Sequence, residues 1–188
     1  GEYDCIAETA IGSVVASTRV VLAGPPGAPG AVVADDITAT SARLHWADGS
    51  DNGRLTTGYL IEGVTNHDDN FGGNRWMTLL NISLNENGGN DSPHIETMPE
   101  TGRRVVMLRD RLSPWSTYRF RVSARNSIGI GLPSEPSPSY NTEKSVPFKA
   151  PTNVGGGGGK VGTLTVMWDP LPPRDWNAPD IWYRVYYK

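Results

Sequence analysis

The chain has 188 residues, of which 37% are apolar and 20% are charged, and its formal net charge is −3 at pH 7. This composition is ordinary for a globular protein and argues against disorder of the chain as a whole. The basic residues are scattered along the sequence, so the charge pattern also argues against nucleic acid or a membrane surface as a partner.

Glycine and proline divide the sequence into short apolar stretches. There are 22 glycines and 15 prolines, and they lie mostly between these stretches. Both residue types favour turns, and proline lacks the N–H that a strand ladder needs. The predicted fold class is therefore all-β: an antiparallel β-sandwich that is complete in the centre of the chain, with partial modules at both ends.

Residues 1–23 resemble the ending of an immunoglobulin-like domain. Tyr3 stands two residues before Cys5, the single cysteine of the chain, as a tyrosine does on the penultimate strand of such domains. The sequence from Cys5 to Leu22 predicts two strands that turn around Gly12. In immunoglobulin domains this cysteine bridges to an earlier strand, so we expect the disulfide partner of Cys5 to lie outside the fragment.

Residues 24–30 are predicted to be a linker. The segment reads Gly-Pro-Pro-Gly-Ala-Pro-Gly, and proline both fixes φ and interrupts a sheet. We expect a short and rather stiff connection.

Residues 31–145 are predicted to form one complete fibronectin type III module. Apolar and polar residues alternate up to Trp46, which places its indole in the core, and Tyr59 points inward from the next strand. Leu112 stands six residues before Tyr118, with a proline between them. We expect Leu112 to close the bottom of the sandwich and the Tyr118 hydroxyl to cap upstream backbone.

The strand that begins near Tyr118 carries a row of arginines on its outer face, Arg119, Arg121 and Arg125. In one interpretation they form a solvated sheet face and pair with Glu62. In the other they form a surface that binds an acidic partner or a sulfated glycan. Alternating charge on an exposed strand is usual in antiparallel sheets, which favours the solvated face.

Residues 150–188 are predicted to begin a second fibronectin type III module. Trp168 occupies the place of Trp46, and Tyr183-Arg184-Val185 follows it as Tyr59-Leu60-Ile61 follows Trp46. We therefore expect Trp168 in a core and a strand at Tyr183–Val185. Three strands alone leave an apolar face uncovered.

Two acceptor triplets for N-linked glycans begin at Asn81 and Asn90 and indicate the secretory route, although Pro93 weakens the second. Residues 85–102 are polar and rich in glycine. We interpret them as an exposed and disordered insertion that the surface tolerates, with a partner-binding loop as the alternative.

No catalytic, cofactor-binding or metal-binding residue is predicted, and no enzymatic activity. His45, His67 and His94 lack the spacing of zinc ligands. The sequence from Asp68 to Asn70 lacks the alternation of a calcium loop. No serine stands in a Gly-x-Ser-x-Gly elbow, and the run Gly155–Gly159 is not followed by the Lys-Ser or Lys-Thr of a phosphate loop.

Three segments together resemble the contactin family of neural adhesion molecules. They are Trp46 with the turn Gly49–Asn52, the stretch Leu112–Tyr118 with Trp115 inside it, and Ala150–Val154 followed by five glycines. Contactins carry six immunoglobulin domains followed by four fibronectin type III domains. The fragment resembles the junction that runs from the last immunoglobulin domain into the second fibronectin domain.

The resemblance implies an extracellular cell-adhesion glycoprotein whose segment acts as modular spacer and protein–protein interaction scaffold at cell–cell junctions. It implies a C-terminal glycosylphosphatidylinositol anchor outside this fragment, on the extracellular face of the plasma membrane. Implied partners are other immunoglobulin-superfamily adhesion proteins and neurexin-like contactin-associated proteins. One alternative is the ectodomain of an enzyme-linked receptor, such as a receptor tyrosine phosphatase; another is an intracellular muscle-type array.

Overall fold

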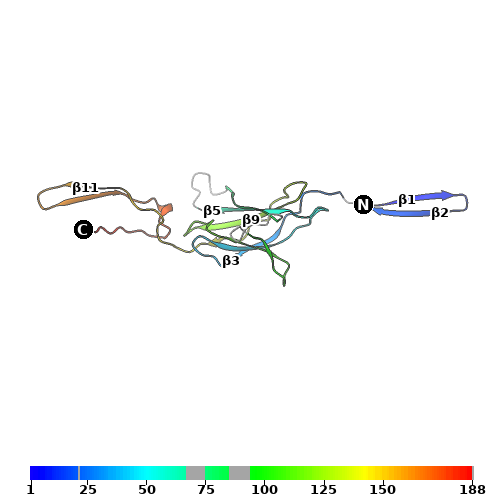
Figure 1. Cartoon of the computed structure of the whole chain (residues 1–188), viewed down its shortest axis with the longest axis horizontal. Coiled ribbons are helices and arrows are strands. Elements are labelled where there is room, and N and C mark those ends of the chain that lie inside the picture. Colours follow the sequence, from blue (N-terminus) through cyan, green and yellow to red (C-terminus); the bar gives the residue numbers. More distant parts are fainter. Residues whose placement is uncertain (21, 67–74, 85–93, 188) are drawn as a thin grey trace.

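The computed structural model describes residues 1–20, 22–66, 75–84 and 94–187 (Figure 1). Its elements are β1 (Glu2–Thr9), β2 (Gly12–Arg19), β3 (Gly30–Asp35), β4 (Ala42–Ala47), β5 (Gly58–Thr65), β6 (Met77–Ser83), β7 (Glu96–Thr97), β8 (Arg104–Leu108), β9 (Thr117–Arg125), β10 (Tyr140–Asn141), β11 (Thr152–Gly158), β12 (Leu164–Asp169) and the short 3-10 helix η1 (Pro173–Asp175). Every strand pairing is antiparallel.

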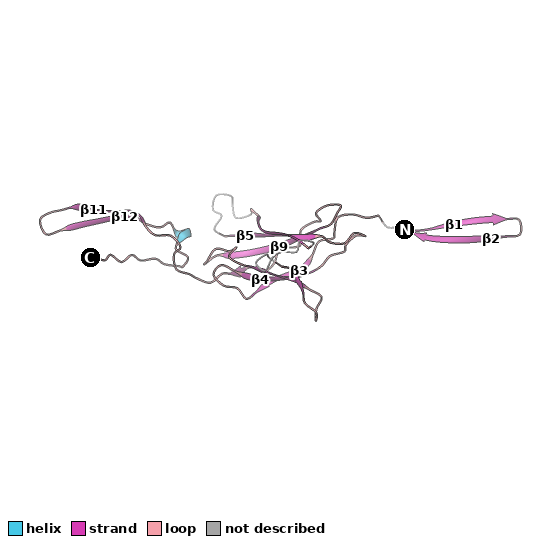
Figure 2. Cartoon of the chain, in the orientation of Figure 1, coloured by secondary structure: helices cyan, strands magenta, loops and turns pink. Residues whose placement is uncertain are grey.

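The central module is a sandwich of two sheets. One sheet has the strand order β3-β4-β8-β7 and the other β10-β9-β5-β6, and they face each other across the core (Figure 2). Strand β5 pairs with both β6 and β9, whereas β6 ends its sheet. This arrangement confirms the predicted all-β fold class and its antiparallel sandwich.

Trp46 and Tyr59 occupy the middle of the core. Both are 0% exposed, and their rings meet edge to face with centroids 5.2 Å apart. The core around them comes from the inward positions of both sheets: Val32, Ala42, Leu44, Ile61, Leu79, Leu80, Ile82, Ile95, Val106, Leu108, Leu112, Tyr118, Phe120, Val122 and Ala124. The period-2 alternation of β4 and β9 therefore corresponds to inward and outward positions.

A polar cluster at the sheet end satisfies the Tyr59 hydroxyl. This hydroxyl donates a hydrogen bond to Asp48 Oδ1 at 2.5 Å, while Asp48 Oδ2 accepts one from Arg104 Nε at 2.8 Å. Burial, together with the bond to Asp48, raises the pKa of Tyr59 well above its ordinary value of 10.0. Tyr59 thus packs in the core with its polar end paired.

Tyr118 forms the expected corner at the other end. The N–H of Ser113 donates to the Tyr118 hydroxyl at 2.9 Å, and Leu112 is buried beside it. The ring of Tyr118 stacks on Phe120, with centroids 5.8 Å apart. The corner ties the loop before β9 to the core.

The polar insertion expected at residues 85–102 is ordered at its end, which contradicts the prediction for that part. Ile95 is 7% exposed and belongs to the core. Strand β7 follows it directly and pairs with β8, which extends the first sheet by one strand. A single apolar residue in a polar stretch carries little periodicity, so the sequence pattern missed it. Residues 85–93 lie outside the described residues.

Strands β1 and β2 form the predicted hairpin near the amino end. They pair from Glu2 with Arg19 to Thr9 with Gly12, and Cys5 lies opposite Ala16. All residues of both strands are exposed, including Cys5. The disulfide of Cys5 stays a prediction.

The carboxy-terminal unit differs from the prediction. The glycine-rich β11 pairs with β12. The prediction of a strand at Tyr183–Val185 is wrong, because residues 181–187 pair with no described strand. A strand needs a neighbour for its backbone groups. Trp168 is half-buried rather than enclosed in a core, and it packs on Tyr183 with ring centroids 5.5 Å apart.

Candidate interaction surface and module joints

The arginine row lies on β9, on the outer face of the sheet β10-β9-β5-β6. Arg121 Nε forms an ion pair with Glu62 Oε2 at 2.7 Å, and its guanidinium lies 4.4 Å from the centroid of the Trp76 ring. Arg119 is exposed, and its Nε donates to the carbonyl of Ser137 at 3.3 Å. The two side chains are therefore held against their own module.

Arg125 crosses β5 to reach β6. It stands opposite Gly58 in the register, and its guanidinium donates to Ser83 Oγ at 2.5 Å. A Cβ atom at Gly58 would lie 2.5 Å from Arg125 Nε, so this position has no room for a side chain beneath the arginine. The aliphatic part of the Arg125 side chain lies across the outer face of the sheet. These contacts fit the solvated-face interpretation of the row.

The two glycan acceptors differ in placement. Asn81 lies in β6 and is exposed. Asn90 lies outside the described residues, as do His67 and the stretch Asp68–Asn70. His94 is exposed, and His45 is half-buried with its Nε2 3.4 Å from Asp35 Oδ2.

Residues 24–30 do not form a free tether, although they contain no strand before Gly30. The N–H of Gly27 donates to the carbonyl of Ser50 at 2.7 Å, and the N–H of Gly24 donates to that of Asn52 at 3.1 Å. Asn52 Nδ2 donates in return to the carbonyl of Pro25 at 2.7 Å. Pro26 and Pro29 are buried. The connection lies along the module as an ordered segment.

Asn126 joins this connection to the hairpin that follows β9. Its Nδ2 donates to the carbonyl of Gly24 at 2.8 Å, and its Oδ1 accepts from the N–H groups of Ile128 at 2.9 Å and Gly129 at 3.2 Å. The side chain is only 7% exposed. One buried amide thus holds the hairpin after β9 and the start of the connection together.

Gly131 allows the connection to approach this hairpin. A Cβ atom at Gly131 would lie 2.1 Å from the carbonyl oxygen of Pro26. Backbone is in direct contact with backbone there, so any side chain would push the two segments apart.

The connection after the central module is held in a similar way by the following unit. The N–H of Ser145 donates to the carbonyl of Asn177 at 2.8 Å, and Asn177 Nδ2 donates to the carbonyl of Val146 at 2.8 Å. Asn177 is buried and has a φ of 58°, a left-handed conformation that asparagine tolerates. Lys149 Nζ donates to both carboxylate oxygens of Asp175 at 2.9 Å.

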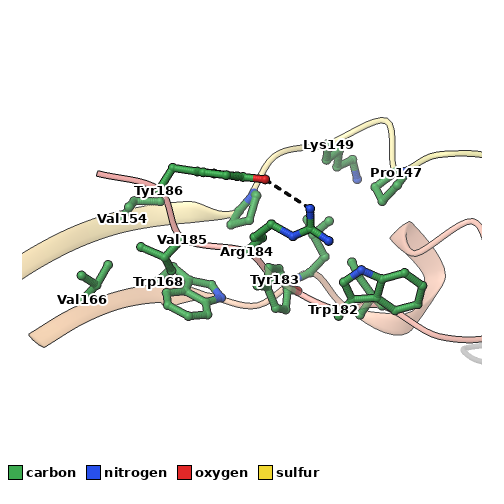
Figure 3. Close-up of a pocket in the computed structure, with 13 residues that line it drawn as sticks. Pro147, Lys149, Val154, Val166, Trp168, Trp182, Tyr183, Arg184, Val185 and Tyr186 are labelled. Atoms are coloured by element: carbon green, nitrogen blue, oxygen red, sulfur yellow. Dashed lines mark hydrogen bonds between the residues drawn. The ribbon is translucent and has the colours of Figure 1, made fainter. Parts of the chain in front are cut away.

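A cavity of about 420 Å³ lies between this connection and the carboxy-terminal unit. Figure 3 shows Trp168 and Tyr183 at its lower side and Pro147 and Lys149 above Trp182. Within it Arg184 donates a hydrogen bond to the Tyr186 hydroxyl at 3.3 Å. The residues that line the cavity are mostly apolar and aromatic. Such a lining is expected where the inner face of a sheet is not covered by another described sheet.

Sequence reasoning missed the three asparagines at the joints, Asn52, Asn126 and Asn177. Their side chains bind backbone carbonyls of other segments, and no periodicity marks such contacts. The one available signal is the spacing of Asn126 and Gly129, since an asparagine that caps its own turn favours a glycine shortly after it.

Among the described residues, no helix is long and apolar enough to cross a membrane. The same part of the chain contains no group of three or more His, Cys, Asp or Glu side chains arranged to hold a metal ion.

Residues 27–140 match the fibronectin type III domain family. The whole chain is 40% identical to a contactin of Drosophila melanogaster and 36% identical to human contactin-1, but it spans only 12% and 17% of their lengths. The crystal structure of the FN1–FN3 domains of chicken CNTN1 is 33% identical, with a TM-score of 0.57 over 81% of this chain and 44% of that one.

Proposed function

The chain belongs to the fibronectin type III family and is related to the contactins over its whole length, and we propose that it is a segment of a cell-surface adhesion receptor. In this proposal the central module is a spacer that sets the distance and direction between its neighbours. The fibronectin match and the contactin relatives support binding and spacing rather than catalysis.

The observation that carries the spacer role is that both connections are fixed by hydrogen bonds. Gly27 and Asn126 hold the first connection to the central module, and Asn177 holds the second to the unit that follows. A free linker of similar length would let the neighbouring modules sample many directions. A docked connection restricts that sampling. A force on one neighbouring module, or a partner bound to it, then acts on the other neighbour in a defined direction.

The partners and the location of the protein are part of the same proposal. We propose that the whole protein lies on the extracellular face of the plasma membrane at cell–cell junctions, held there by a glycosylphosphatidylinositol anchor. Its proposed partners are immunoglobulin-superfamily adhesion proteins and neurexin-like contactin-associated proteins. The contactin relatives support the cell-surface location, and the resemblance to contactins is the basis for the rest.

The experiment compares the full ectodomain with two variants displayed on cells that do not otherwise adhere. One variant lacks residues 31–144, and the other carries a flexible Gly/Ser segment of the same length in their place. For a spacer, we expect soluble partners to bind all three equally, whereas adhesion between cells falls in both variants. Loss of soluble binding would instead place the partner site in the module, and unchanged adhesion would contradict the spacer role.

A further inference from the structure

Asn81 begins the acceptor triplet Asn81-Ile82-Ser83, and the structure leaves its amide available. Asn81 is exposed in β6, the last strand of its sheet, and its side chain forms no hydrogen bond with a described residue. Ile82 points into the core. Because successive residues of a strand face opposite sides, Asn81 and Ser83 belong to the outer face of the sheet.

We propose that Asn81 carries an N-linked glycan whose first sugar rests on this outer face. In the transfer step Asn81 Nδ2 forms a bond to C1 of the sugar, and the bond between C1 and the pyrophosphate of a lipid-linked oligosaccharide donor breaks. The amide loses one proton, and the lipid pyrophosphate leaves. The Ser83 hydroxyl completes the acceptor triplet.

The face beside Asn81 offers a floor for one sugar ring. Leu60 is the register partner of Asn81, and Ser123 is the partner of Leu60 on the next strand. Leu60 is half-buried and faces outward, whereas Ser123 is buried. Arg121 and Arg125 stand two positions to either side of Ser123 on the same strand, and guanidinium groups can donate hydrogen bonds to sugar hydroxyls. The apolar side of the ring would cover Leu60.

Such a glycan would protect two features of the module. It would cover the arginine row, which then serves as support for the sugar rather than as a docking surface for a protein. It would also shield the edge of β6 that pairs with no described strand, since unpaired strand edges invite pairing with other chains. The inference rests on the proposed function only in requiring entry into the secretory pathway.

The first test is glycopeptide mass spectrometry on the full-length protein expressed in animal cells and collected from the cell surface. We expect the peptide with Asn81 to carry a glycan, and Asn81→Gln to remove the mass of one glycan. Thr78→Gln, a change at a neighbouring exposed position of β6, is expected to leave the mass of the glycan in place. A bare Asn81 in surface protein would overturn the site while leaving the adhesion proposal intact. A protein that never enters the pathway would overturn both.

The second test asks whether the first sugar contacts the face. One sample is trimmed enzymatically to a single sugar at each site, and another is stripped of all sugars. We expect the trimmed protein to keep the melting temperature of the untreated one, and the stripped protein and Asn81→Gln to melt a few degrees lower, about 2 to 5 °C for a contact of this size. Identical melting of all four samples would overturn the contact. With Leu60→Ser as a further variant, the difference between trimmed and stripped protein should shrink.

Discussion

Replacing Asn126 by alanine should destabilise the central module by about 2 to 3 kcal/mol. The substitution removes three well-formed hydrogen bonds, to the carbonyl of Gly24 and from the N–H groups of Ile128 and Gly129. Each such bond contributes on the order of 0.5 to 1.5 kcal/mol to the free energy of unfolding. Water can reach part of the vacated site near the surface and replace some of the lost hydrogen bonding. The expected loss of free energy is therefore smaller than the largest value that the three bonds together could contribute.

The assay is urea unfolding followed by tryptophan fluorescence, since Trp46 reports on the core of the module. Ser127→Ala is the matched control, because Ser127 is exposed in the same turn and should change the free energy by less than about 0.5 kcal/mol. Asn126→Asp keeps the acceptor for the turn but loses the donor to Gly24, so it isolates the bond to the connection. A loss below about 0.5 kcal/mol in Asn126→Ala would refute the role of this side chain.

Four further outcomes are expected from unfolding measurements. Trp46→Ala should cost about 3 to 5 kcal/mol, and a cost below about 1 would mean that the indole is not packed as described. Gly131→Ala should cost about 1 to 3 kcal/mol, because its Cβ would strike a carbonyl of the connection, whereas Gly129→Ala has space and should be milder. Ile95→Ala should cost about 2 to 4 kcal/mol; no loss would restore the interpretation of this segment as a dispensable insertion. Because the pKa of Tyr59 is raised on folding, its contribution is complete below its ordinary pKa of 10.0 and is lost as pH rises above that value. The free energy of unfolding should therefore fall as the pH rises above 10.0, and it should fall less steeply in the Tyr59→Phe variant.

Alternation and the tyrosine corner were sufficient to predict the sandwich. Trp46 lies on a strand where every second residue is buried, and in the next strand the buried Tyr59 and Ile61 are separated by the half-buried Leu60. Tyr118 stands at a fixed distance from Leu112, and its hydroxyl accepts the backbone bond that this spacing implies. Such features are local in sequence, so a pattern can reveal them.

The joints could not be predicted in the same way. Residues 24–30 contain prolines that break a strand, which favoured a plain linker, yet their carbonyls accept hydrogen bonds from Asn52 and Asn126. These partners are far apart in sequence, and an asparagine that binds a distant carbonyl looks like any other polar loop residue. The absent strand at Tyr183–Val185 has a related cause, since strand formation depends on a neighbour as well as on sequence.

Hydrogen exchange of the backbone amides at Gly27 and Ser145, measured by mass spectrometry in the full-length ectodomain, will show whether the module holds its connections. Both N–H groups donate to carbonyls of another segment, Gly27 to Ser50 and Ser145 to Asn177. If the connections are docked, exchange at both amides should be slower than in an unstructured peptide by about a hundredfold, and Asn126→Ala should remove most of the protection at Gly27. Exchange as fast as in a free peptide would mean that the connections are loose tethers and that the module does not orient its neighbours.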